Sequence, residues 1–185
     1  MDVFWQQGFQ RTSMSDLEAA TDVLRGSLYW TFGDKHSLFV HALNHYRQIA
    51  RDVIEEHLEP EAPTLETLRH ALLGVVTECS GPDAAKGCLM GNSAVELTAR
   101  DPEIRAVVRQ HYLWMETRFA EVLRAAIDAG EVAAERDPQA LGRLLVVSIQ
   151  GLKVLGKTGP TRGELEDVVD EILRGLGLSG DPSGG

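Results

Sequence analysis

Apolar residues recur at spacings of three and four along nearly the whole chain, and no convincing run alternates apolar and polar residues. This spacing is typical of amphipathic helices and predicts an all-α fold. Glycine, proline and helix-capping residues separate the apolar stretches. We expect one short helix ending at Gly8, followed by helices over about 13–21, 24–32, 35–59, 64–79, 89–98, 102–129, 138–155 and 161–175.

Several of these helices carry start signals in the sequence. Thr12 or Ser13 is an N-cap for the second helix, and Asp16 is placed to complete a capping box. Asp101-Pro102-Glu103 and Asp137-Pro138-Gln139 each combine a cap with proline at the first helical position. These signals fix where the second, seventh and eighth helices begin.

Residues 12–35 contain two short helices joined by a tight turn at Asp22-Val23, which is the outline of a helix-turn-helix. Leu28 and Phe32 define the core side of the second of these helices. Trp30 then points away from the core, and we expect it to be exposed. For Tyr29 the pattern leaves a core position and a contact position equally open.

The string Gly26-Ser27-Leu28-Tyr29-x-x-Phe32, followed by Lys35 and preceded by Thr-Ser-Met-x-Asp-Leu at 12–17, resembles the N-terminal domain of the TetR family of bacterial transcriptional regulators. The resemblance implies an N-terminal three-helix DNA-binding domain over 1–46, with its first helix truncated. It also implies a helical ligand-binding and dimerisation domain over 47–178. Residues 179–185 are Gly/Ser-rich, and we expect a disordered tail there.

The resemblance assigns DNA contacts to the residues that match the motif. Hydroxyls and amides at a helix start bind phosphate, arginine reads guanine, and glycine allows close approach of the backbone. The residues implied to contact DNA are Thr12, Ser13, Arg25, Gly26, Ser27, Tyr29, Trp30 and Lys35. Without the surrounding motif, Arg25 and Lys35 would be taken for ordinary solvated charges.

Two positions in the turn depart from the family pattern. Asp22 stands where glycine is usual, and aspartate tolerates left-handed geometry better than most residues. Leu24 stands where a capping serine or threonine is usual, and loss of such a cap costs about 0.5–2 kcal/mol of helix stability.

The last two helices are too apolar for isolated surface helices, so we expect them to form a homodimer interface. The alternative is that they are simply buried in the monomer. The predicted interface residues are Leu141, Leu145, Ser148, Ile149, Leu152, Leu165, Val168, Val169 and Ile172.

A ligand cavity is expected among the fifth to eighth helices, where aromatic side chains occur together with a few polar residues. Taken singly, each of these residues fits an ordinary core position. The candidate lining residues are Cys88, Met90, Asn92, His111, Tyr112, Trp114, Met115, Phe119 and Gln150.

Composition narrows the classes of function. The net charge is −10, yet Met1–Arg47 has five acidic and four basic residues, so the remaining −9 lies downstream of the DNA-binding candidate. Two cysteines, no leader segment and no apolar run long enough for a membrane fit a cytoplasmic protein. No enzyme motif is found, so we expect no catalysis, and the histidines His36, His41 and His45 lack a completing ligand, so we expect no metal or cofactor.

These patterns predict a transcriptional repressor that binds a palindromic double-stranded operator as a homodimer and is released by an unidentified small-molecule inducer. Two alternatives remain at this point. One is a helical adaptor for protein contacts, and the other is a regulator that senses oxidants or electrophiles through Cys79 and Cys88. For these two thiols, structural burial is the favoured interpretation.

Overall fold

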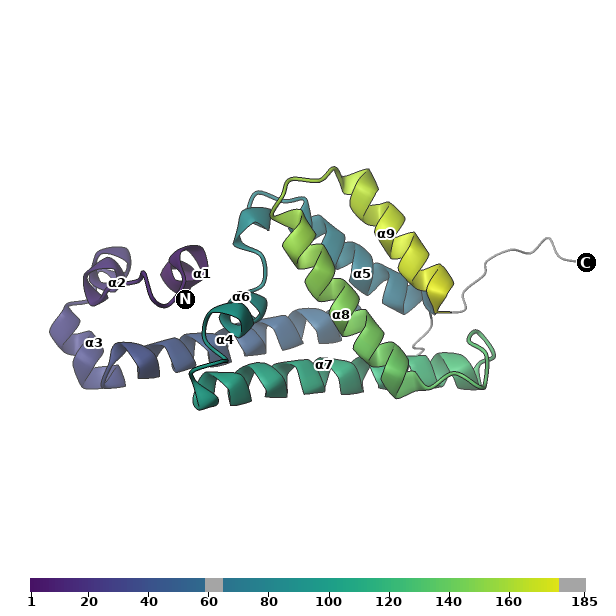
Figure 1. Cartoon of the computed structure of the whole chain (residues 1–185), viewed down its shortest axis with the longest axis horizontal. Helices are drawn as coiled ribbons and strands as arrows, with labels where there is room; N and C mark the ends of the chain where they lie inside the picture. Colours follow the sequence, from purple (N-terminus) through teal and green to yellow (C-terminus); the bar gives the residue numbers. More distant parts are fainter. Residues whose placement is uncertain (59–64, 177–185) are drawn as a thin grey trace, which may run out of the picture. The chain divides into compact units, whose positions relative to one another are not determined.

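The computed structural model describes residues 1–58 and 65–176, and every regular element in this part of the chain is helical (Figure 1). The all-α fold class is therefore confirmed. The helices are α1 Asp2–Gln7, α2 Met14–Thr21, α3 Arg25–Phe32, α4 Lys35–His57, α5 Leu65–Cys79, the short 3-10 helix η1 Ala84–Lys86, α6 Leu89–Glu96, α7 Pro102–Asp128, α8 Pro138–Gly156 and α9 Arg162–Gly175.

The observed helices differ from the predicted ones in small ways. Residues 80–87 separate two of the predicted helices, and η1 forms within this segment. The end of the predicted helix 35–59, the segment 60–63, the expected helix start at Thr64 and the tail at 179–185 lie outside the described residues. None of the described helices is long and apolar enough to cross a membrane.

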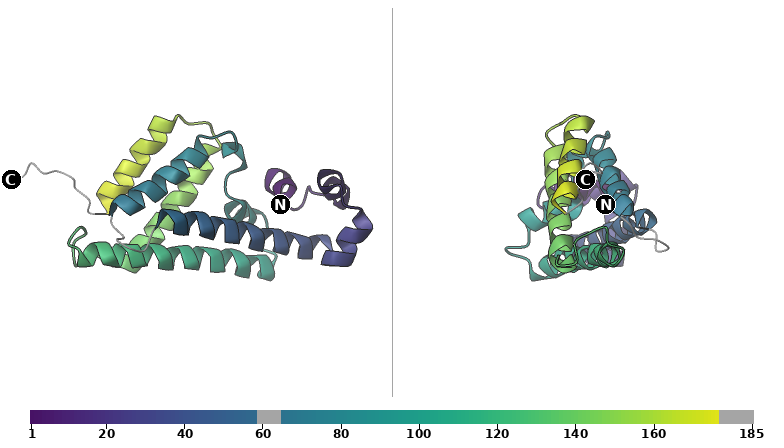
Figure 2. Two further views of the ribbon diagram at one scale, coloured as in Figure 1. Left: turned by 180° about the vertical axis from the view of Figure 1, so that it is seen from behind. Right: turned by 90° about the vertical axis from the view of Figure 1, so that its right-hand side faces the viewer.

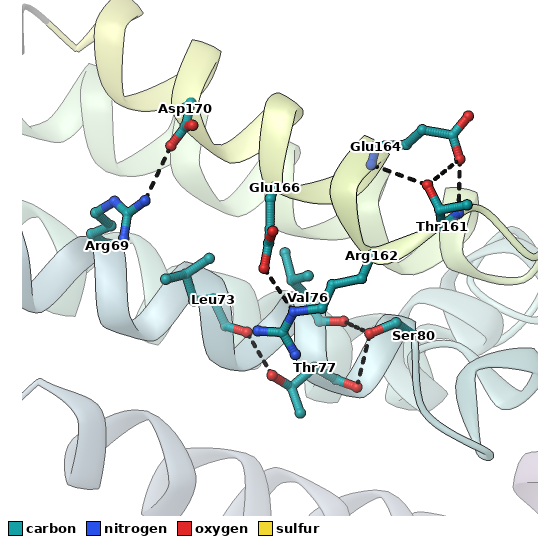
Figure 3. Close-up of polar contacts among 10 residues, drawn as sticks. All are labelled: Arg69, Leu73, Val76, Thr77, Ser80, Thr161, Arg162, Glu164, Glu166 and Asp170. Carbon is teal, nitrogen blue, oxygen red and sulfur yellow. Dashed lines mark hydrogen bonds and ion pairs between the residues drawn. The ribbon is translucent and has the colours of Figure 1, made fainter.

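Capping explains most of the helix starts. The Ser13 hydroxyl oxygen accepts from the Asp16 amide at 3.1 Å, while the Asp16 carboxylate accepts from the Ser13 amide at 2.7 Å, so the predicted capping box is confirmed. Thr161 and Glu164 form a second capping box at the start of α9 (Figure 3). These bonds join residues three apart, which is why the sequence predicts them well.

The chain divides into two compact units. Unit 1 comprises Met1–Asp52 and Cys88–His111. Unit 2 comprises Val53–Gly87 and Tyr112–Gly185, of which the structure describes residues 53–58, 65–87 and 112–176. The helices α4 and α7 contribute residues to both units, and α6 belongs to unit 1. The sequence predicted two domains that follow each other along the chain, with a boundary between residues 46 and 47. This boundary stays a prediction.

The core of unit 1 is aromatic. Phe4 and Phe39 are almost fully buried and meet edge to face, with ring centroids 4.9 Å apart. Phe9 lies 5.0 Å from Phe39, so helix α1 and the segment after it pack on the first turns of α4. Leu17 of α2 and Leu28 of α3 are also buried, and these contacts hold the DNA-binding candidate together.

In unit 2, α8 and α9 lie beside α5 (Figures 1 and 2). Two glycines of α8 allow close approach of helices. An added Cβ at Gly142 would lie 2.6 Å from the Glu116 carbonyl oxygen, and one at Gly156 would lie 2.8 Å from the Cys79 Cβ. On the outer side of the α5–α9 contact, Arg69 pairs with Asp170 at 3.5 Å (Figure 3).

His111 is a buried titratable group at the end of unit 1. Its side chain is 2% exposed, and burial, with the nearby charges of Arg47 and Arg51, lowers the pKa of the imidazole to about 4. His111 is therefore neutral at pH 7.

This pKa predicts a pH-dependent stability. Between pH 6.5 and 4 the unfolded state binds a proton on His111 that the folded state does not bind. The free energy of unfolding should therefore fall as pH drops through this window, by up to about 3 kcal/mol from this group. Denaturant unfolding at several pH values tests this, and His111→Gln should flatten the profile. If the free energy of unfolding falls equally steeply with decreasing pH in His111→Gln and in the parent protein, this account is contradicted.

The third helix lacks a side-chain cap, because Leu24 occupies its N-cap position. Leu24 is 72% exposed and has the extended ψ of 138° that capping residues adopt, so serine fits there without loss of core packing. We expect Leu24→Ser to raise the free energy of unfolding of unit 1 by about 1 kcal/mol. Leu24→Ala removes the leucine without adding an acceptor and should give no gain. Chemical denaturation followed by far-UV circular dichroism measures both.

Candidate nucleic-acid interface

The turn between α2 and α3 contains a left-handed residue, as its sequence predicts. Asp22 has φ 55° and ψ 25°, and among the described residues it is the one non-glycine with positive φ. Its amide donates to the Glu18 carbonyl at 3.0 Å and closes α2. The turn is therefore formed with aspartate in place of glycine.

Helix α3 exposes nearly all of its surface. Leu28 is its one buried residue, whereas Trp30 is 90% exposed. The expectation that Trp30 points away from the core is confirmed, and Tyr29 is also on the exposed side. Arg25, Gly26 and Ser27 occupy the exposed first turn, and nothing lies within 4 Å of a Cβ built on Gly26. The five residues of α3 that are predicted to contact DNA are therefore all exposed on this helix.

Glu18 of α2 is a member of this surface that the sequence analysis missed. Its carboxylate accepts from the Arg25 backbone amide at 3.2 Å and pairs with the Arg25 Nε at 3.1 Å. The first contact satisfies one of the amides that Leu24 does not cap. The second holds the guanidinium at the start of α3. No local sequence signal marks this pair, because its members are seven residues apart on different helices.

Lys35 has an environment that the family motif does not predict. Its ammonium donates to the carbonyl oxygens of Phe9 at 3.0 Å and Thr12 at 2.9 Å. The same nitrogen lies 4.4 Å from the centre of the Phe9 ring. Two of its three N–H donors therefore hold the segment between α1 and α2, which leaves one for phosphate.

Thr12 and Ser13 differ in what they offer to DNA. Thr12 is 1% exposed, and its hydroxyl donates to the Gly8 carbonyl at 2.7 Å, so this hydroxyl is used within the protein. Ser13 is exposed and its hydroxyl donates to Asp16. Hydrogen bonds from Ser13 lower the pKa of the Asp16 carboxyl, which keeps a negative charge at the start of α2.

The predicted ligand-lining residues are divided between the two units. Cys88, Met90, Asn92 and His111 belong to unit 1, and the other five belong to unit 2. In unit 1 the Cys88 sulfur accepts from the Gly91 amide at 3.4 Å and lies 3.5 Å from the Tyr46 hydroxyl. In unit 2 the hydroxyl of Tyr112 donates to Gln150 at 3.2 Å. Met115 and Phe119 are buried in the unit 2 core, and Trp114 packs against it.

The two cysteines are both buried. Cys79 lies in the core of unit 2, and Cys88 forms the N-cap of α6 in unit 1. Reactive thiols are usually accessible to solvent. The burial fits the structural interpretation that the sequence favoured.

On α8 and α9, most predicted interface residues face inward. Those buried in the core of unit 2 are Leu141, Leu145, Ile149, Leu152, Leu165 and Val169. Ser148, Val168 and Ile172 line a groove of about 460 Å³ together with Leu144, Asp167, Glu171 and Gly175. The apolar side chains that α8 exposes are Leu144, Val147, Val154 and Leu155.

The comparisons with known proteins cover both parts of the chain. Residues 1–42 match the model for bacterial regulatory proteins of the tetR family, and residues 64–172 match the tetracyclin repressor-like C-terminal domain. The uncharacterized HTH-type transcriptional regulator YezE of Bacillus subtilis is 32% identical over 94% of this chain and 90% of its own length. The HTH-type transcriptional repressor ComR of Escherichia coli is 26% identical over 94% of this chain and 83% of its own.

Solved structures agree with these matches. A cysteine mutant of the TetR family regulator CifR, complexed with a 26-bp double-strand operator, aligns with a TM-score of 0.82. It is 28% identical in sequence, and the alignment covers 95% of this chain and 91% of that one. Because the matches extend over both the helix-turn-helix and the following helices, we conclude that this chain belongs to the TetR family and is a DNA-binding transcriptional regulator.

Proposed function

We propose that this protein is a repressor that binds a palindromic operator as a homodimer and is released by a small-molecule inducer. The observation that carries the proposal is helix α3, whose one buried residue, Leu28, leaves its polar side chains and the rings of Tyr29 and Trp30 open to a partner. The similarity to CifR, a cysteine mutant of which is complexed with operator DNA in its structure, supports the same interpretation. The repressor ComR supports repression as the direction of control.

The first turn of α3 is suited to read base edges in the major groove. Arg25 has the paired donors that recognise guanine O6 and N7, and the open space around Gly26 lets the backbone approach. Trp30, near the other end of α3, offers its ring to a sugar or a thymine methyl group. The remaining donor of Lys35 is the phosphate contact that we propose, and Ser13 is left out because its hydroxyl and its amide both donate to the Asp16 carboxylate. Thr12 is left out, because its hydroxyl is buried.

A homodimer brings two copies of α3 to a palindrome, and α8 offers a surface for this association. Its exposed apolar residues recur at helical spacing along one face and adjoin the groove shared with α9. This face differs from the inward residues expected from the sequence. We propose that it forms the dimer contact.

An inducer site is proposed in unit 2, between α8 and the part of α7 that follows His111. Within unit 2, the hydrogen-bonded pair Tyr112 and Gln150 supplies polar groups beside an apolar core, which is the composition of many ligand sites. The chemical class of the inducer is left open by these residues.

Replacing Arg25 tests the DNA-binding assignment. We expect Arg25→Ala to weaken binding to a palindromic fragment from the protein's own promoter region about tenfold or more, because a bidentate base contact is lost. Fluorescence anisotropy with labelled DNA measures the Kd. Arg162→Ala is the matched control, because Arg162 is a similarly exposed arginine paired with a glutamate on α9. Equal affinities of the Arg25 variant and the parent protein would refute the role of Arg25.

Replacing Val147 tests the dimer face. Val147 is 68% exposed on α8, so glutamate there should leave the fold intact and place charge in the proposed contact. We expect Val147→Glu to raise the dimer dissociation constant roughly tenfold or more, as measured by analytical ultracentrifugation. Val95→Glu, at an exposed valine of α6, should leave association unchanged. Undiminished dimerisation of the Val147 variant would exclude this face.

A further inference from the structure

The last residue of α6, Glu96, reaches back to the segment that joins α1 to α2. Its carboxylate accepts from two successive backbone amides, that of Phe9 at 3.1 Å and that of Gln10 at 2.8 Å. These residues are 87 and 86 positions away in the sequence, and all of them belong to unit 1. A carboxylate on two backbone N–H groups is a charge-assisted arrangement, which is about twice as strong as the neutral one.

The backbone beside these amides is shaped to admit the carboxylate. Gly8 has φ +80°, and a Cβ built on it would lie 2.9 Å from the Glu96 Oε2. Any other residue at position 8 would be strained and would also crowd the carboxylate. The close approach of Glu96 therefore depends on glycine at this position.

The carbonyl groups of the same segment are held from a different helix. The ammonium of Lys35, in the first turn of α4, donates to the carbonyl oxygens of Phe9 and Thr12. A negative side chain thus binds the amides and a positive side chain binds the carbonyls. We call residues 8–12, with Glu96 and Lys35, the loop clasp.

The loop clasp leads directly into the DNA-binding surface. Ser13, the N-cap of α2, follows Thr12, and α2 carries Glu18, which pairs with Arg25 of the recognition helix. A change in the path of residues 8–12 therefore moves the start of α2. Lys35 binds two carbonyls of the clasp, and Glu96 binds two of its amides.

We propose that Glu96 is a positioning residue for operator binding, which ties the end of α6 to the loop before α2. This inference rests on the proposed function.

The experiment compares the full-length Glu96→Ala and Glu96→Gln variants with the parent protein. Amide hydrogen exchange at Phe9 and Gln10, resolved by NMR, should accelerate at least about tenfold in Glu96→Ala, because both acceptors are lost. Glu96→Gln keeps one acceptor oxygen and should give a smaller increase. Operator affinity should fall in the same order, by about tenfold in Glu96→Ala.

Glu131→Ala is the matched control. The Glu131 carboxylate also accepts from a backbone amide, that of Leu65 at 2.9 Å, but this pair lies in unit 2. The control variant should keep the parent exchange rates at Phe9 and Gln10 and the parent operator affinity. The thermal unfolding midpoints of all variants identify any general loss of stability.

A double-mutant cycle separates positioning from general destabilisation. Gly8→Ala should weaken operator binding in the parent protein, partly by displacing the Glu96 carboxylate and partly by strain at positive φ. In the Glu96→Ala background only the strain remains, so Gly8→Ala should weaken operator binding less than it does in the parent protein. Additive losses would overturn the proposed contact.

The remaining outcomes are also decisive. Unchanged exchange at Phe9 and Gln10 in Glu96→Ala would show that the clasp does not hold the loop. Faster exchange with an unchanged operator Kd would overturn the positioning role. If the parent protein binds no promoter fragment, the proposed function fails, and the operator role of Glu96 fails with it. The exchange rates still report on the clasp itself in that case.

Discussion

The recognition helix buries one residue, Leu28, so its position depends on contacts supplied by its neighbours. An eight-residue helix with one core contact has little stability of its own. Three other features hold it: the left-handed Asp22 turn, the Glu18 carboxylate at its first amide, and the packing of α2 through Leu17. Because so little of α3 is buried in the core, most of its side chains are accessible to DNA.

Several of the charged side chains near α3 are engaged in contacts within unit 1. Glu18 pairs with Arg25, and Asp16 is engaged in the capping box of α2. Further away, Glu96 is bound to two amides and Lys35 to two carbonyls. Each of these charged side chains therefore stabilises the conformation of the DNA-binding surface in the absence of DNA. Arg25, which we propose as a base contact, is paired with Glu18 at an exposed position.

Unit 2 places its apolar residues on two sides of α8. The inward side packs on α5, helped by Gly156 at the close approach to Cys79. The outward side exposes Val147 and Val154. The exposure of these apolar side chains to water does not stabilise a monomer. The apolar residues of α8 therefore predict association in the sequence, but their spacing does not show which of them lie outside the core of unit 2.

The sequence by itself determined the helices, their caps and the motif that identifies the family, because these depend on residues within a few positions of each other. The Ser13–Asp16 box, the left-handed Asp22 and the exposed Trp30 are of this kind. Only the tertiary structure decided that Thr12 is buried and that Lys35 and Glu96 hold the same loop. It also decided which face of α8 remains outside the core. These features depend on how helices distant in sequence pack and on their rotation about their axes, and spacing along the chain does not fix either quantity.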